Sequence, residues 1–377
     1  MTLKANINVR DVGLSGMIDK PQFQHLTMEE VNRKKGTNGY NVVSTFSGAG
    51  GSCIGLKLAG FNVVYGVEFI PSAQEVYEMN HDSFLDKRDI REITGEDILT
   101  KCNLKKGELE LFEGSPPCAS FSQMGKGTET WNCEKFYSGT HQRVDDLFFE
   151  YIRLVDEIRP LMFVAENVPA LAQGKNKGML KLIVNNLRDI GYDVEIRLID
   201  ATFLDVPQKR QRLILIGCRR DTGIKINFPK PKKYQYVVND AIPDFQDHKP
   251  SEEYLTFQNS MYLQDRFDYC REHHLHNFAE ASKVLHGKRS GYAYRLVYGD
   301  EFAPTFIQKV ECWHGYQNRS ISIDEAKILQ TFPVDFQLKG SFIKQWERIG
   351  RSVPPRVYEA VGLCIKKSLD DYYAKEG

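Results

Sequence analysis

The sequence predicts an α/β protein whose larger part is a doubly wound, mostly parallel β-sheet, joined to a smaller and irregular domain. Three observations support this. Between Tyr40 and about Asp221, apolar runs of strand length alternate with amphipathic runs of helix length. A glycine-rich turn directly follows the first apolar run. After Asp221 the alternation stops, and prolines, aromatic residues and short irregular segments continue to about Gln317.

The individual elements follow from apolar periodicity and from residues that begin or end helices. Gly60 ends the first helix, Pro71 suits a first helical turn, and Arg159-Pro160 ends a third helix. Strands are expected at Tyr40–Phe46, Asn62–Glu68, Leu109–Glu113, Leu161–Ala165, Val194–Ile199 and Leu213–Gly217. Helices are expected at Ser52–Ala59, Pro71–Asn80, Val144–Ile158, Met179–Ile190, Asp324–Thr331 and Pro354–Tyr372. The predicted domains are an N-terminal arm of unknown role (1–39), the larger domain (40–222 plus 336–377) and the smaller domain (223–335).

Composition excludes several classes of protein. No apolar run approaches the roughly 18 residues needed to span a bilayer, and the N-terminus has no apolar segment of the secretory kind. We therefore expect a cytoplasmic protein with no membrane contact. The eight cysteines form no C-x-x-C pair and no zinc-like cluster with histidine, so no metal site is expected.

Charge is balanced globally and uneven locally. Lys and Arg number 50, as do Asp and Glu. Between Asp205 and Gln235, however, nine basic residues face only two acids. Such a stretch suits phosphate, although a solvated basic face is an equal alternative on charge alone.

The first motif is the glycine-rich turn after the first strand, formed by Phe46, Ser47, Gly48, Ala49, Gly50 and Gly51. Small residues let a ligand approach the backbone there, at the edge of the sheet where such cofactors bind. Glu68 ends the second strand, where a carboxylate holds ribose hydroxyls in this class of site, and Asp89 is placed to meet an adenine amine. The turn alone fits NAD, FAD or S-adenosylmethionine, or no ligand at all.

Three further motifs follow later strands of the predicted sheet. Cys118 follows the run Gly114-Ser115-Pro116-Pro117, and two prolines and a polar loop are unusual neighbours for a buried structural cysteine. The long polar loop after Cys118 is typical of a mobile lid. Glu166 and Asn167 emerge at the same edge; cysteine with an acid suits nucleophilic addition with proton donation. Before the last strand, Gln208, Arg210 and Arg212 share one face of an extended segment. Alternatively, Glu166 is an acid that caps a helix, and the segment with Arg210 and Arg212 is an ordinary basic edge without a ligand.

These blocks, in this order, resemble the DNA (cytosine-5) methyltransferase family, in particular bacterial modification methylases. The resemblance runs from about Asn41 to Ile365 and includes Tyr294–Thr305, Asn318–Pro333 and Ile349–Pro355. It implies a Rossmann-like S-adenosylmethionine methyltransferase sheet with a target-recognition domain. It also implies a double-stranded DNA substrate with a flipped-out cytosine.

The resemblance assigns roles to residues. Cys118 would add to carbon 6 of cytosine, Glu166 would hold nitrogen 3, Arg212 would hold the carbonyl oxygen, and Arg210 would steady the site. The expected S-adenosylmethionine pocket consists of Phe46, Ser47, Gly48, Ala49, Gly50, Gly51, Glu68, Phe69, Asp89, Ile90, Pro117, Arg351 and Ser352. The expected DNA contacts are Ser120, Ser122, Asn167, Gln208, Lys225, Lys232, Lys233 and Arg319.

Two positions depart from the family pattern. Ala119 stands where Gln is usual, and Arg351 where Asn is usual, but neither change removes a group that makes bonds. A transfer RNA methyltransferase of a related branch is an alternative, but the Cys-Phe-Thr tripeptide of that branch is absent. A silent DNA-binding regulator is another, although it would be expected to lack Cys118, Glu166 or the arginines. We expect a monomer located at the nucleoid, and the sequence leaves open whether a cognate restriction endonuclease accompanies it.

Overall fold

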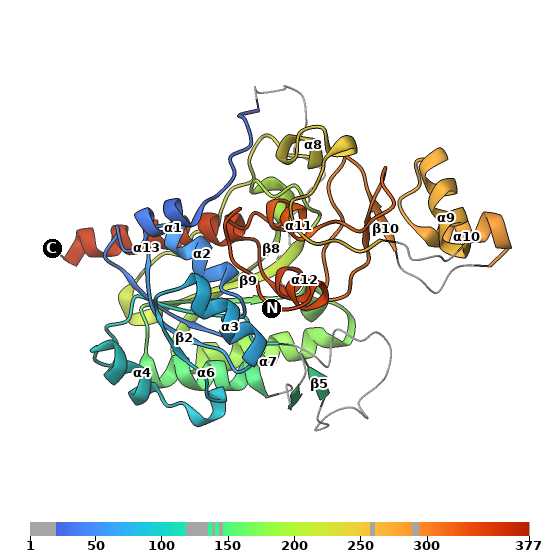
Figure 1. Cartoon of the computed structure of the whole chain (residues 1–377). Helices are drawn as coiled ribbons and strands as arrows, with labels where there is room; N and C mark the ends of the chain where they lie inside the picture. The colour runs from blue at the N-terminus through green and yellow to red at the C-terminus, as the bar shows by residue number, and fades with distance from the viewer. Residues whose placement is uncertain are drawn as a thin grey trace.

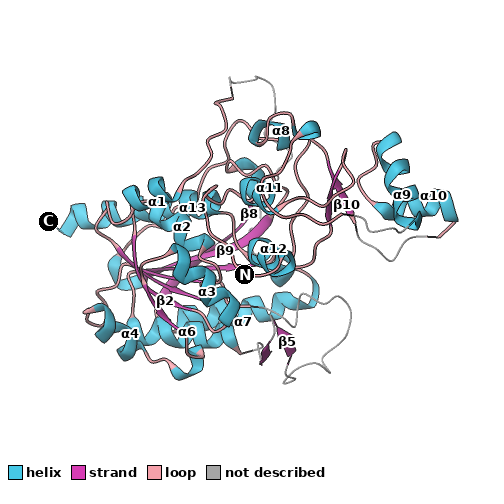
Figure 2. Cartoon of the chain, in the orientation of Figure 1, coloured by secondary structure: helices cyan, strands magenta, loops and turns pink. Residues whose placement is uncertain are grey.

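The computed structural model describes residues 20–117, 135–137, 140–142, 146–256, 261–288 and 294–376. Within these residues seven strands form one sheet in the order β3-β2-β1-β4-β7-β9-β8. Figure 2 draws the strands in magenta. The strands are β1 (Asn41–Thr45), β2 (Asn62–Val67), β3 (Phe84–Asp86), β4 (Leu111–Gly114), β7 (Met162–Asn167), β8 (Tyr192–Asp200) and β9 (Gln211–Arg219). A separate antiparallel pair is formed by β5 (Lys135–Tyr137) and β6 (Thr140–Gln142).

The sheet is parallel except at β9, which pairs antiparallel with both β7 and β8. The predicted doubly wound, mostly parallel sheet is therefore confirmed. Because β1, β2, β4 and β7 run in one direction, their carboxyl ends meet at one edge. The glycine-rich turn, Glu68 and Pro117 follow β1, β2 and β4, and Glu166 is the last residue but one of β7.

Helices cover both faces of the sheet, and alternate strand residues enter two separate cores. On one face, α4 (Gly95–Cys102), α6 (Leu147–Ile158) and α7 (Lys177–Asp189) pack against residues such as Val43, Phe112 and Phe163. On the other, α2 (Gly51–Leu58) and α13 (Pro355–Glu376) pack against Val42 and Val164, with α3 (Pro71–Asn80) at the edge. Burial on both faces explains why these strands are continuously apolar.

Helices α2 and α13, far apart in the sequence, lie side by side (Figure 1). Gly55 allows this approach, because a Cβ atom there would lie 2.4 Å from the carbonyl oxygen of Pro355. The expected helix Pro354–Tyr372 thus packs back onto the sheet, as predicted.

The region after β9 has little regular structure. Its elements are α8 (Val238–Ala241), α9 (Met261–Glu272), α10 (Phe278–His286), β10 (Arg295–Val297), β11 (Cys312–His314) and α11 (Ile323–Leu329). One core cluster joins Phe245, Val297, Phe306 and Ile323 to Trp346 of α12 (Phe342–Arg351). A second cluster attaches α9 and α10 to β10 and β11, and these two helices project away from the sheet (Figure 1).

Residues 20–39 lie across both regions. Helix α1 (Met28–Lys34) packs on α2, and Leu26 and Val31 are buried with Phe332 and Phe336. The ion pair Lys20–Asp240 (2.6 Å) ties the start of this segment to α8. Among the described helices, none is both long and apolar enough to cross a membrane.

Candidate active site

A cavity of about 670 Å³ opens at the carboxyl ends of β1, β2, β4 and β7. Its volume suits a cofactor-sized ligand. All the predicted cofactor residues except Gly50 line it, together with three of the residues expected to act on the substrate. The predicted residues found in the lining are Phe46, Ser47, Gly48, Ala49, Gly51, Glu68, Phe69, Asp89, Ile90, Pro117, Glu166, Asn167, Arg212, Arg351 and Ser352.

The turn between β1 and α2 is tight and strained. Phe46, Gly48 and Gly50 all have positive φ angles, 54°, 56° and 85°. Such a conformation is rare for phenylalanine and indicates a constraint at a functional site. Gly50 cannot carry a side chain, since a Cβ atom would lie 2.0 Å from Nε2 of His81, whereas the equivalent position at Gly48 meets nothing within 4 Å. The turn therefore leaves open space beside its backbone where a ligand needs it.

Glu68 follows β2 and is 7% exposed. Its carboxylate accepts hydrogen bonds from the backbone N–H groups of Gly48 and Ile70, both at 2.7 Å. Burial raises its pKa, and the two N–H donors partly oppose the rise. These backbone donors fix the orientation of the carboxylate, which lines the cavity and can accept hydrogen bonds from hydroxyl groups there.

Asp89 and Ile90 form the next part of the lining. The Asp89 carboxylate accepts the N–H of Arg91 (3.0 Å) and so caps the short 3-10 helix Ile90–Glu92. It also pairs with the Arg91 guanidinium (2.9 Å), which reaches Asp146 at the start of α6 (2.6 Å). These contacts fix the position of both lining residues.

Glu166 in β7 and Arg212 in β9 belong to the last two motifs along the sequence, and their side chains form an ion pair in the cavity lining. Arg212 Nε donates to Glu166 Oε1 at 2.6 Å, and the two side chains are 14% and 10% exposed. Burial lowers the pKa of Arg212, and the Glu166 carboxylate opposes this. Asn167 donates from Nδ2 to the carbonyl oxygen of Pro116 (3.1 Å) and thereby holds the segment that leads to Cys118.

The facing wall of the cavity was predicted only in part. Arg351 and Ser352 were expected there, whereas residues 306–309, Glu311, Arg348 and Gly350 were not. Trp346 Nε1 donates to the carbonyl oxygens of Ile307 (2.9 Å) and Lys309 (3.1 Å). The signal for α12 was present in the sequence, because its buried residues Phe342, Trp346 and Ile349 have helical spacing.

Arg210 supports this wall from inside the protein and does not line the cavity. It is 1% exposed, and its guanidinium donates to the carbonyl oxygens of Phe306 (2.8 Å), Gly350 (3.1 Å) and Ser352 (2.7 Å). Gln208 is also fully buried and donates to Gln330 (2.9 Å). The burial of Gln208 conflicts with the expected contact to DNA. The side chains of Gln208 and Arg210 instead connect the segment before β9 to residues of the later region.

Arg351 lines the cavity, as expected. Its Nε pairs with Glu347 of α12 (2.8 Å), and its guanidinium also donates to Gln308. The residue that departs from the family pattern therefore fastens α12 to the facing wall.

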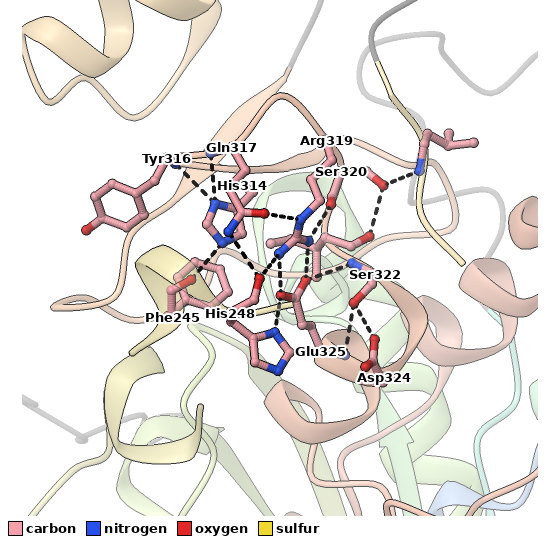
Figure 3. A network of polar contacts seen from close by, with 12 residues as sticks. Phe245, His248, His314, Tyr316, Gln317, Arg319, Ser320, Ser322, Asp324 and Glu325 are labelled. Atoms are coloured by element: carbon pink, nitrogen blue, oxygen red, sulfur yellow. Dashed lines mark hydrogen bonds and ion pairs between the residues drawn. The ribbon is translucent and has the colours of Figure 1, made fainter. Parts of the chain in front are cut away.

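Arg319 is buried, 4% exposed, in a network of polar side chains and carbonyl groups (Figure 3). Its guanidinium pairs with both oxygens of Glu325 at 2.7 Å, and it donates to the carbonyl oxygens of Ser320 and His248. The expectation that Arg319 contacts DNA conflicts with this burial, because all its donors have protein partners nearby. Arg319 instead fixes the start of α11.

The basic tract has mixed surroundings. Lys225 and Lys233 are exposed, whereas Lys232 pairs with Asp205. None of the three lines the cavity. Cys118, Ser120, Ser122 and most of the predicted lid lie outside the described residues.

The doubly wound sheet, the glycine-rich turn and the buried carboxylate after β2 define the class of protein as an α/β protein with a nucleotide-type cofactor site. Solved structures share the fold. A DNA modification methyltransferase encoded in an E. coli prophage has a TM-score of 0.65 at 24% identity and covers 88% of this chain and 99% of its own. DNMT2 from Spodoptera frugiperda has a TM-score of 0.61 at 15% identity, covering 89% and 99%.

The sequence comparisons are more specific. The model of the C-5 cytosine-specific DNA methylases matches residues 40–367. The type II methyltransferase M.MthTI of Methanothermobacter thermautotrophicus is 29% identical over 88% of this chain and 98% of its own. M.PspPI of a Psychrobacter species is 30% identical over 88% and 80%. The chain belongs to the C-5 cytosine-specific DNA methylases and transfers a methyl group from S-adenosylmethionine to cytosine in DNA.

The described residues fit this cofactor. Glu68 presents a carboxylate that can accept hydrogen bonds where a ribose would place its hydroxyls, and Phe46 and Ile90 supply apolar surface for an adenine ring. When bound, S-adenosylmethionine supplies an activated methyl group on its sulfonium. The cavity continues from Glu68 to the Glu166–Arg212 pair, so one space joins the cofactor end to the end where a base is expected.

Proposed function

We propose that this enzyme methylates carbon 5 of a flipped-out cytosine within a specific duplex DNA sequence, with Cys118 as its nucleophile. The observation that supports this most strongly is the continuous cavity with Glu68 near one end and the Glu166–Arg212 pair near the other. A cofactor site alone serves many acceptors. A buried acid and a guanidinium at 2.6 Å, beside the segment before Cys118, form a binding site for a polar ring.

In the proposed reaction the Cys118 thiolate adds to carbon 6, which makes carbon 5 electron-rich. Carbon 5 then takes the methyl group, and loss of the carbon 5 proton expels Cys118 and restores the ring. Glu166, sharing a proton with nitrogen 3, stabilises the charge that develops on the ring, and Arg212 holds the carbonyl oxygen. Asn167 acts indirectly, because it holds the Pro116 carbonyl and so positions the chain before Cys118.

The duplex is proposed to lie between the larger domain (40–222 plus 336–377) and the smaller domain (223–335). Lys225 and Lys233 are exposed and are proposed to contact phosphates, with Lys232 released from Asp205 when DNA binds. We propose that the enzyme acts as a monomer at the nucleoid, as the modification partner of a type II system.

The test is methyl transfer from labelled S-adenosylmethionine to mixed-sequence duplex DNA and, in parallel, to transfer RNA. Label is expected in DNA cytosine with wild-type protein and is expected to be absent with Cys118→Ser, which keeps the size of the side chain but weakens the nucleophile. Cofactor binding, measured separately, is expected to survive the substitution.

Each other result has a distinct meaning. Label in RNA alone would replace the DNA substrate by transfer RNA. Label in neither, with cofactor binding intact, would favour a silent DNA-binding regulator. Label in DNA that persists in Cys118→Ser would remove Cys118 from the mechanism.

A further inference from the structure

The segment of residues 89–95, which follows β3, lies along one face of α6. It contains two residues that line the cavity. Positions 153 and 157 of α6 share one face with its N-cap, position 146, because of their helical spacing. Arg153 Nη2 donates to the carbonyl oxygens of Ile90 (3.0 Å) and Ile93 (2.9 Å), and Glu157 accepts the N–H of the last residue of the segment (2.6 Å). Helix α6 therefore supports this part of the cavity lining.

The third contact on this face is an arginine between two carboxylates. Arg91 Nη1 donates to both oxygens of Asp89, at 3.1 and 2.9 Å. Its Nε and Nη2 donate to the two oxygens of Asp146, at 3.2 and 2.6 Å. Asp146 directly precedes Leu147, which lines the cavity and belongs to the same core cluster as Ile90. Arg91 thus joins the polar and the apolar sides of this part of the lining.

The contacts of Asp89 differ between its two oxygens. Oδ1 accepts two donors, the backbone N–H of Arg91 (3.0 Å) and Nη1 of the same residue (3.1 Å). Oδ2 accepts only Nη1. Each carboxylate oxygen can accept two hydrogen bonds, so these contacts leave one acceptor position on Oδ2 of a residue that lines the cavity. That position suits an amino group, which donates, and disfavours a carbonyl oxygen, which can only accept.

The charge of Arg91 holds two negative groups together. Burial lowers the pKa of Arg91, but the hydrogen bond to Asp146 and the charges of Asp89 and Asp146 outweigh this effect, so the pKa is raised and the guanidinium stays charged. Because two carboxylates share one cation, Asp89 remains a strong acceptor. Without the guanidinium the two carboxylates would repel each other, and Asp89, which is partly exposed, would turn toward water.

A second arginine of the same stretch shows what a purely structural arrangement looks like. Arg88 also lies between two carboxylates, at 2.7 Å from Asp86 and 3.4 Å from Asp97. None of these three residues lines the cavity. Only the arrangement around Arg91 places a carboxylate in the lining, so stability alone does not distinguish the two arginines and their position does.

We propose that Arg91, anchored by Asp146, is a positioning residue that holds Oδ2 of Asp89 so that the cofactor pocket selects a purine with a 6-amino group. The inference rests on adenine lying beside Asp89. It depends on neither Cys118 nor Glu166, because it concerns binding of the cofactor and not transfer of the methyl group.

The experiment measures binding by calorimetry for two ligands that differ at one position. S-adenosylhomocysteine carries the 6-amino group, and S-inosylhomocysteine carries a carbonyl oxygen in its place. The wild type is expected to prefer the adenine ligand by about 100-fold, because the inosine ligand loses a hydrogen bond to a charged group and sets an oxygen against the carboxylate. Asp89→Asn is expected to lose nearly all of this preference, because an amide can donate as well as accept.

Two further variants test the positioning role. Arg91→Met leaves Asp89 in place but removes its cation, and the preference is expected to fall to about tenfold, since a carboxylate turned toward water gives up part of the hydrogen bond. Asp146→Ala removes the anchor and no capping hydrogen bond, and it is expected to have the same effect. The double variant is expected to equal Arg91→Met, because both substitutions break one arrangement.

Arg88→Met is the matched control. Its melting temperature is expected to fall, because the buried Asp86 carboxylate loses its cation. Its preference for the adenine ligand is expected to equal that of the wild type. A variant that merely loosens the segment after β3 therefore changes stability and not selection.

Three results would overturn the inference: a wild-type preference near one, a wild-type preference in Arg91→Met, or losses that add in the double variant. If Arg91→Met does not fold, a wild-type preference in Asp146→Ala would have the same meaning. A failure of the proposed function is separate, because absence of label in DNA with the expected preferences would contradict the methylation reaction and leave the role of Arg91 intact.

Discussion

The two walls of the cavity are built in different ways. One wall comes from the carboxyl ends of β1, β2, β4 and β7, where most lining residues are the last residues of a strand or follow it within a few positions. The other consists of residues 306–311 and the end of α12, and neither segment directly follows a strand of the main sheet. It is held by contacts between residues far apart in the sequence, such as Arg210 with Phe306.

The difference teaches which kinds of functional residue a sequence reveals. A strand end fixes where a side chain lies, so a carboxylate such as Glu68 is assigned by its position alone. A wall held by backbone carbonyl groups leaves no comparable pattern, because any sequence supplies carbonyls. The polar residue that binds them, Arg210, then resembles a catalytic arginine.

The largest expected effect separates two nearby arginines, Arg210 just before β9 and Arg212 within it. Arg212→Met is expected to lower the single-turnover rate by roughly 10²–10³ while the fold is retained, because the carbonyl oxygen of the cytosine loses the donor proposed to hold it. Arg210→Met is expected to lower the free energy of unfolding by about 3 kcal/mol, since three buried carbonyl groups lose their donor. Urea denaturation and methylation assays on both variants measure this. If Arg210→Met lost activity at unchanged stability, the structural assignment of Arg210 would be wrong.

The next effect probes the first wall alone. Glu68→Gln places an amide N–H group against one of the two backbone donors that the carboxylate accepts. Affinity for S-adenosylmethionine, measured by calorimetry, is expected to fall by roughly 100-fold, the value of one or two charged hydrogen bonds. Glu75→Gln in α3 is exposed and serves as the control. Unchanged affinity in Glu68→Gln would exclude Glu68 from the cofactor site.

The smallest effect probes the second wall. In Gly350→Ala the added Cβ atom would lie 2.3 Å from the carbonyl oxygen of Ile307, so residues 306–311 must shift. We expect about a tenfold loss of cofactor affinity, about 1.4 kcal/mol. Gly178→Ala in α7 meets nothing within 4 Å and should leave binding unchanged. Equal affinities for the two variants would mean that the second wall does not contact the cofactor.

Much of the sheet was predictable because its strands are apolar runs separated by glycine and proline. The strand β3, three residues long at the sheet edge, gave no periodic signal, and α4 was missed although Thr94 and Asp97 form a capping box. The turn at Phe46–Gly51 and Glu68 were identified because a cofactor site requires small residues and an acid at those places. The expected DNA contacts of Gln208 and Arg319 came from the family resemblance. Their burial against polar partners depends on tertiary contacts, which the sequence alone does not reveal.

The late position of the second wall also bears on how the enzyme is made. While the ribosome has produced only the sheet, up to Arg219, the growing chain already contains Glu68, Glu166 and Arg212, but nothing faces them. The wall that completes the cavity is translated between residues 306 and 353. A message cut within that interval would yield a chain that lacks both the second wall and α13, so a complete cofactor site requires synthesis beyond both.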